Sequence, residues 1–102
     1  MSTTQNARLS TLVREKRDEI LRIAAKHGAR NVRVFGSVVR GEDGPESDLD
    51  LLVHFDEGRS LLDHAALMLE LQSALGRDVD IASDEGLKER VRERILSEAV
   101  SL

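Results

Sequence analysis

Three aspartates carry the clearest potential for chemistry in this sequence. Asp48 and Asp50 stand two positions apart at the start of the apolar run "DLDLLVHF", and Asp80 stands within the shorter run "DVDIA". In a β-strand, residues two apart point to the same side about 6.6–6.8 Å from one another, so Asp48 and Asp50 should project together. If the strands carrying these runs are neighbours, all three carboxylates can converge on one point.

Carboxylates gathered in this way would favour a divalent cation. They repel one another, and one or more of them would be driven to take up a proton. All-oxygen ligation selects Mg²⁺ or Mn²⁺ over zinc, and two such ions can stabilise both the attacking and the leaving oxygen of a phosphoryl displacement. The competing interpretation is structural: Asp48 caps a turn, Asp50 pairs with an arginine and Asp80 is exposed.

A phosphate-binding turn is predicted just before the aspartates. Gly36 and Ser37 directly follow the alternating run "VRVF", and Asp48 comes eleven positions beyond Ser37. Glycine lets backbone approach a ligand closely, and free N–H groups at a following helix start bind phosphate. Arg40 either clamps a triphosphate or pairs with Asp48 or Glu42 to order the loop, and we favour the structural role.

Hydrophobic periodicity and breaker residues predict the elements that position these groups. In order, they are a helix from Leu9 to His27, a strand from Val32 to Phe35, a short helix, a strand from Leu49 to Phe55, a helix from Ser60 to about Leu75, a strand from Asp78 to Ala82 and a last helix opened by Asp84 or Glu85. Ser60 and Asp63 resemble a capping box. The order predicts an α/β fold, with a small mixed sheet of three or more strands flanked by helices.

Composition predicts one soluble globular domain over residues 1–102, with 40% hydrophobic and 33% charged residues. Residues 41–85 hold thirteen acidic and two basic residues, and aromatic residues make up 2%. Duplex nucleic acid is therefore disfavoured as a ligand, and base stacking has no platform. The absence of cysteine excludes thiolate metal sites, and the lack of long apolar runs or a signal-like start favours a cytoplasmic protein.

These motifs together resemble a known family. Gly36-Ser37, ten residues and then Asp48-x-Asp50 resemble the signature of the DNA polymerase β-like nucleotidyltransferases. "GSVVRGE…SDLDLLV" followed by "RDVDIA" resembles the minimal nucleotidyltransferases of prokaryotes, and the stretch "ILSEAVSL" is also typical of them. The resemblance implies that Gly36 and Ser37 hold a nucleoside triphosphate. It also implies that Asp48 and Asp50 bind two Mg²⁺ ions, while Asp80 completes the triad and activates the attacking hydroxyl.

Short members of that family resemble the MntA antitoxins, whose partner is a helical HEPN toxin. The implied activity is that of a protein adenylyltransferase, which transfers AMP from ATP to a tyrosine of the toxin. Two alternatives stay open: a nucleotidyltransferase that modifies a small molecule in a pocket completed by a partner, and an antitoxin that acts by binding alone. A phosphatase with a D-x-D motif fits poorly, because no Gly-Ser turn precedes the motif there. Apolar helix faces also leave a homo-oligomer open.

Overall fold

The computed structural model describes residues 9–41 and 48–102. Its elements in chain order are α1 (Leu9–Glu15), α2 (Arg17–Lys26), β1 (Ala29–Phe35), α3 (Ser37–Arg40), β2 (Leu49–Phe55), α4 (Leu61–Leu75), β3 (Val79–Ser83), the 3-10 helix η2 (Asp84–Gly86), α5 (Glu89–Glu98) and β4 (Val100–Ser101). The predicted strand Leu49–Phe55 and the short helix after Ser37 are confirmed. In the described part of the chain, no helix has the length and hydrophobicity that a membrane crossing requires.

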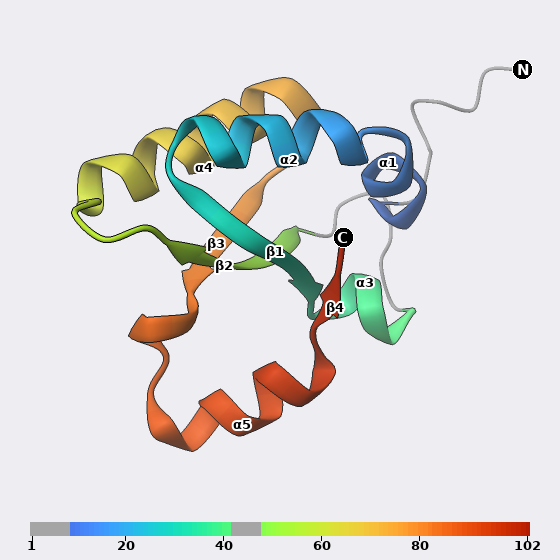
Figure 1. The fold of residues 1–102 in the computed structure, drawn as a ribbon. Coiled ribbons are helices and arrows are strands. Elements are labelled where there is room, and N and C mark those ends of the chain that lie inside the picture. The colour runs from blue at the N-terminus through green and yellow to red at the C-terminus, as the bar shows by residue number, and fades with distance from the viewer. Residues whose placement is uncertain (1–8, 42–47) are drawn as a thin grey trace, which may run out of the picture.

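The strands form a mixed sheet in the order β3-β2-β1-β4. β1 pairs antiparallel with both β2 and β4, whereas β2 and β3 run parallel. Figure 1 shows α2 and α4 together on one face of this sheet, with α5 on the opposite side. The predicted α/β architecture is therefore confirmed, because a small mixed sheet lies between helices.

The hydrophobic core lies between the sheet and the helices α2 and α4. Leu49, Leu51 and Val53 alternate along β2 and are fully buried in it. A row of leucines on α4 packs there too: Leu67, Leu71 and Leu75 are all buried. Because one face of β2 is apolar and anchored in this way, the opposite face is free to carry Asp50.

Local sequence signals set the bounds of α4. The Ser60 hydroxyl accepts a hydrogen bond from the N–H of Leu62, and the Asp63 carboxylate accepts one from the N–H of Ser60 at 2.9 Å. These contacts complete the predicted capping box. The helix ends at Leu75, directly before Gly76, as predicted.

The prediction of one helix from Leu9 to His27 was wrong, because the structure has two helices there, α1 and α2. Lys16 interrupts it with φ −104° and ψ 16°, although its N–H still donates to the carbonyl of Leu12. The ammonium of Lys16 reaches the carbonyl of Ala74 near the end of α4. The bend thus accompanies a contact 58 residues away, which helical periodicity does not report.

The last helix was also placed wrongly, since α5 begins at Glu89 and not at Asp84 or Glu85. Asp84 instead opens η2, because its side chain bonds to the strands of the sheet. The apolar side chains of this helix stay out of the core, and Val91 and Leu96 are exposed. Val100 leaves the helix altogether and pairs with Val34 as part of β4.

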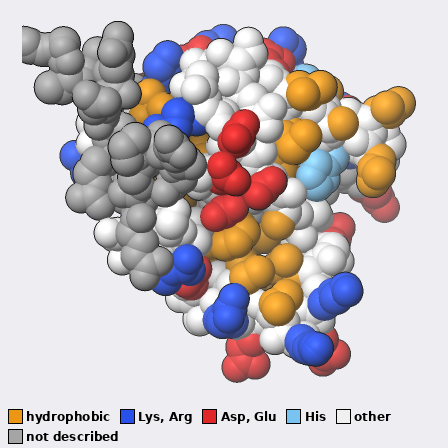
Figure 2. Space-filling model, turned by 180° about the vertical axis from the view of Figure 1, so that it is seen from behind, with side chains coloured by type: hydrophobic (Ala, Val, Ile, Leu, Met, Phe, Trp, Pro, Cys, Tyr) orange, Lys and Arg blue, Asp and Glu red, His pale blue; other side chains and the backbone are white. Residues whose placement is uncertain are grey.

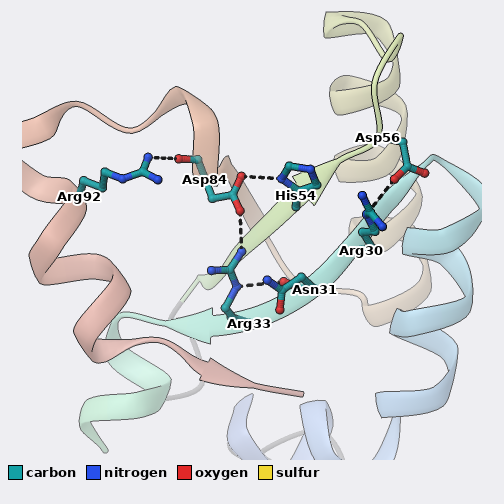
Figure 3. Close-up of polar contacts among 7 residues, drawn as sticks. All are labelled: Arg30, Asn31, Arg33, His54, Asp56, Asp84 and Arg92. Carbon is teal, nitrogen blue, oxygen red and sulfur yellow. Dashed lines mark hydrogen bonds and ion pairs between the residues drawn. The ribbon is translucent and has the colours of Figure 1, made fainter.

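The carboxylate of Asp84 joins three elements (Figure 3). One oxygen lies 3.0 Å from His54 Nδ1 on β2, and the other accepts a hydrogen bond at 3.0 Å from the guanidinium of Arg33 on β1. Burial raises the pKa of Asp84, but the bonds from His54 and Arg33 prevail and hold it below its ordinary value. The ionised form is therefore the one that the fold stabilises.

We expect Asp84→Asn to lower the free energy of unfolding by about 1–3 kcal/mol at neutral pH, because it removes a charged acceptor from two bonds. A carboxyl whose pKa is depressed on folding contributes stability above its unfolded pKa and loses it as pH falls through the folded pKa. Urea unfolding at several pH values should show the difference between variant and wild type shrinking with acidification. Asp56→Asn, which breaks an exposed pair with Arg30, is the matched control and should cost less than about 1 kcal/mol. A pH-independent loss would contradict the role given to Asp84.

Candidate active site

Parallel pairing of β2 with β3 sets two of the predicted aspartates side by side. The register matches Leu49 with Val79, and Asp50 with Asp80. Residues matched in this way lie on adjacent strands about 4.8 Å apart and point to the same face of the sheet. Asp48 precedes β2 by one residue, is exposed, and shares the parity of Asp50. The prediction that these strands are neighbours is confirmed.

The predicted phosphate turn lies directly against this pair. Phe35, the last residue of β1, is in register with Asp50, so the chain enters Gly36 beside the Asp50 carboxylate. Gly36 has φ +82°, and a Cβ built on it would meet an oxygen of Asp50 and lie 3.1 Å from its Cγ. Only glycine can adopt this backbone at this proximity. Ser37 then opens α3 and is half-buried.

Burial and the neighbouring carboxylates both disfavour the charged form of Asp50. Burial, reinforced by the neighbouring carboxylates of Asp80 and Asp48, raises the pKa of Asp50, and the guanidinium of Arg40 opposes this only in part. Figure 2 shows acidic side chains gathered near the centre of one face, bordered by hydrophobic ones. Among residues 9–41 and 48–102, no three His, Asp or Glu side chains stand as a formed ligand set around one point.

Arg40 has a partner that the sequence did not predict. Its guanidinium lies 3.2 Å from one carboxylate oxygen of Glu98, the last residue of α5. Glu98 also accepts a hydrogen bond at 3.0 Å from the backbone N–H of Gly36. The partner predicted for Arg40 was Asp48 or Glu42, and Glu42 lies outside the described residues. Glu98 lies within the stretch "ILSEAVSL", whose resemblance to the minimal nucleotidyltransferases could have marked it as a site residue.

The histidines take structural positions, as the absence of a repeated spacing suggests. His54 bonds to Asp84, and His27 Nε2 lies 2.7 Å from a carboxylate oxygen of Glu70. His64 Nε2 lies 2.9 Å from the carbonyl oxygen of Ile81, and its ring stacks on another aromatic ring. Each imidazole therefore has a partner within the fold.

A cavity of about 590 Å³ lies at the other end of β2 from the aspartates. Its lining includes Arg30, His54, Arg59 and His64, and none of the predicted site residues. The first three bond to carboxylates, and His64 contacts a backbone carbonyl. Because the arginines and histidines of its lining are already engaged, this cavity is a weaker candidate site than the aspartate pair.

Comparison with known proteins agrees with this geometry. The family model described as "Nucleotidyltransferase domain" matches residues 14–102, which include every predicted site residue. The chain belongs to the nucleotidyltransferase domain family. The family match therefore identifies the chain as a nucleotidyltransferase.

Two relatives of this nucleotidyltransferase come from archaea. The provisionally named protein adenylyltransferase MJ0435 of Methanocaldococcus jannaschii is 40% identical over 88% of this chain and 97% of its own length. Protein adenylyltransferase MntA of Thermococcus cleftensis is 41% identical over 74% of this chain and 76% of its own.

Solved structures give the same fold. A provisionally named minimal nucleotidyltransferase superposes with a TM-score of 0.83 at 55% identity, covering 91% of this chain and 95% of the other. A toxin–antitoxin complex with AMP-PNP superposes with a TM-score of 0.73 at 20% identity, covering 82% of this chain and 69% of the other. The second likeness concerns the fold alone.

Two glycines of this nucleotidyltransferase allow a matched test of the close approach at Asp50. Gly36 and Gly41 both have positive φ, but a Cβ on Gly41 would meet nothing within 4 Å. Each alanine variant should lose about 1–2 kcal/mol of unfolding free energy for the backbone conformation. Gly36→Ala should lose about 1–3 kcal/mol more, because its methyl displaces the Asp50 carboxylate. Equal losses in urea unfolding would contradict the contact.

Proposed function

We propose that this nucleotidyltransferase is a Mg²⁺-dependent protein adenylyltransferase, formed by one domain over residues 1–102. It transfers AMP from ATP to a tyrosine of a HEPN-type toxin and thereby acts as an antitoxin. The observation that carries the proposal is the in-register pair of Asp50 and Asp80, with the Gly36 backbone against Asp50. This arrangement joins a cation-attracting pair to a turn that can approach phosphate.

The residues present fit Mg²⁺. Asp48, Asp50 and Asp80 offer oxygen ligands only, which is the donor set of hard cations. The raised pKa of Asp50 reflects burial and repulsion from the other two carboxylates, which a bound cation would relieve. When bound, Mg²⁺ neutralises the charge that develops on the transferring phosphate. Asp48, Asp50 and Asp80 would hold it.

The chain's own groups then have distinct roles. Gly36 and Ser37 hold the triphosphate through backbone N–H groups and a hydroxyl, and Arg40 adds a guanidinium near its negative charge. Asp80 takes the proton of the attacking tyrosine hydroxyl. A bond forms between the tyrosine oxygen and the α-phosphorus, and the bond from that phosphorus to the bridging oxygen breaks, so pyrophosphate leaves with its electron pair.

The names of the relatives support a protein acceptor. Two proteins about 40% identical to this chain are named protein adenylyltransferases, and the structures that share its fold include toxin–antitoxin complexes, one of them a HEPN toxin with an MNT antitoxin. The acceptor tyrosine must come from a partner, because this chain contains no tyrosine. A partner toxin supplies both the acceptor and the recognition that so small an enzyme lacks.

Intact mass spectrometry tests the transfer. Incubation of the enzyme with ATP, Mg²⁺ and its toxin should add AMP-sized masses to the toxin, located on tyrosine by fragmentation. Asp48→Asn combined with Asp50→Asn should slow the appearance of the adduct by about 10²-fold or more, since electrostatic stabilisation of the transferring group is lost. The adduct should also disappear when Mg²⁺ is removed with a chelator.

The matched control is a double variant of two exposed aspartates that are not among the predicted site residues, Asp18→Asn with Asp56→Asn, which should transfer AMP at the wild-type rate. A toxin that acquires no adduct would refute the protein-modifying function. If the Asp48/Asp50 double variant still protects cells without any adduct, the protein neutralises its toxin by binding alone.

A further inference from the structure

A carboxylate already occupies the predicted phosphate-binding groups. Glu98 Oε1 accepts a hydrogen bond at 3.0 Å from the N–H of Gly36, and both oxygens of Glu98 lie 3.2–3.3 Å from the guanidinium of Arg40. The N–H of Gly36, followed by Arg40, holds the pKa of Glu98 below its ordinary value. Glu98 therefore binds as an anion to two groups assigned to the triphosphate.

The helix that carries Glu98 is weakly attached to the rest of the domain. None of the residues of α5 is buried, and Figure 1 shows the helix standing apart from α2 and α4 across the sheet. Before Glu98, the Arg92 guanidinium reaches the carbonyl of Asp84, and after it β4 pairs with β1. Because little apolar surface is buried, releasing Glu98 costs little packing energy.

We propose that Glu98 is an internal competitor of the triphosphate: its carboxylate must leave Gly36 and Arg40 before the phosphates can bind there. The inference rests on the proposed function, because that function assigns Gly36 and Arg40 to the nucleotide. One N–H donates fully to one acceptor at a time, and a phosphate brought next to an ionised carboxylate is repelled. Nucleotide binding thereby releases α5 from the edge of the site.

A different role for Glu98 makes the opposite prediction. If Glu98 held Arg40 in the orientation that contacts the triphosphate, its removal would weaken nucleotide binding. If Glu98 competes, its removal raises the fraction of the protein that is competent to bind, and the apparent affinity rises in proportion. The direction of the change therefore separates a competitor from a positioning residue.

Calorimetric titration with a non-hydrolysable ATP analogue and Mg²⁺ measures this direction. Glu98→Ala should bind the analogue about threefold to tenfold more tightly than wild type. Glu93→Ala removes an exposed glutamate from the same helix and should leave the Kd within about twofold. If wild type and both variants bind no analogue, the proposed function fails. If wild type binds and Glu98→Ala binds equally or more weakly, the competition is refuted.

Hydrogen exchange on the wild-type chain gives a second test that needs no variant. Adding the analogue with Mg²⁺ should speed amide exchange in residues 89–98, because α5 loses its contact with Gly36 and Arg40. Exchange in residues 61–75, which form a helix anchored in the core, should not accelerate. Unchanged or slower exchange in residues 89–98, with binding verified in the same sample, would overturn the inference.

Discussion

The parallel pairing of β2 with β3 is the constraint on which the rest of this enzyme depends. It matches Asp50 with Asp80, and the fully buried Leu49 and Leu51 with Val79 and Ile81. A slip of one residue would turn the aspartates toward the core and the leucines toward solvent, at a cost of several buried side chains. Hydrophobic burial on one face of the sheet thus fixes the chemistry on the other.

Burying the leucines of β2 also lets the fold tolerate a repulsive arrangement. Asp50 stands next to Asp80 and against the backbone of Gly36, with its pKa raised by burial and by its acidic neighbours. Such strain at a functional site persists only where the surrounding structure holds it in place. Here the antiparallel register that sets Phe35 opposite Asp50 brings the glycine turn to the carboxylate.

The sequence predicted features whose causes are local. The bounds of β2 follow from its apolar run, and those of α4 from Ser60, Asp63 and Gly76, so these predictions were correct. The bend at Lys16, the 3-10 turn at Asp84 and the pairing of Glu98 with the Gly36 turn depend on residues 30 to 62 positions away. Hydrophobic periodicity and capping motifs carry no information about such contacts. The start of the last helix was therefore misplaced, and the contact of the Glu98 carboxylate with the Gly36 turn was not predicted.

The pKa values of Asp50 and Glu98, two carboxyl groups near Gly36, are shifted in opposite directions. Asp50 has a raised pKa, because burial and the carboxylates of Asp80 and Asp48 disfavour its charged form. Glu98 has a lowered pKa, because the N–H of Gly36 and the guanidinium of Arg40 favour its charged form. Gly36 lies between the two and contacts both carboxylates. In the proposed function, Mg²⁺ would neutralise the carboxylates around Asp50 and the triphosphate would take the place of the Glu98 carboxylate, so that one ligand would meet both demands.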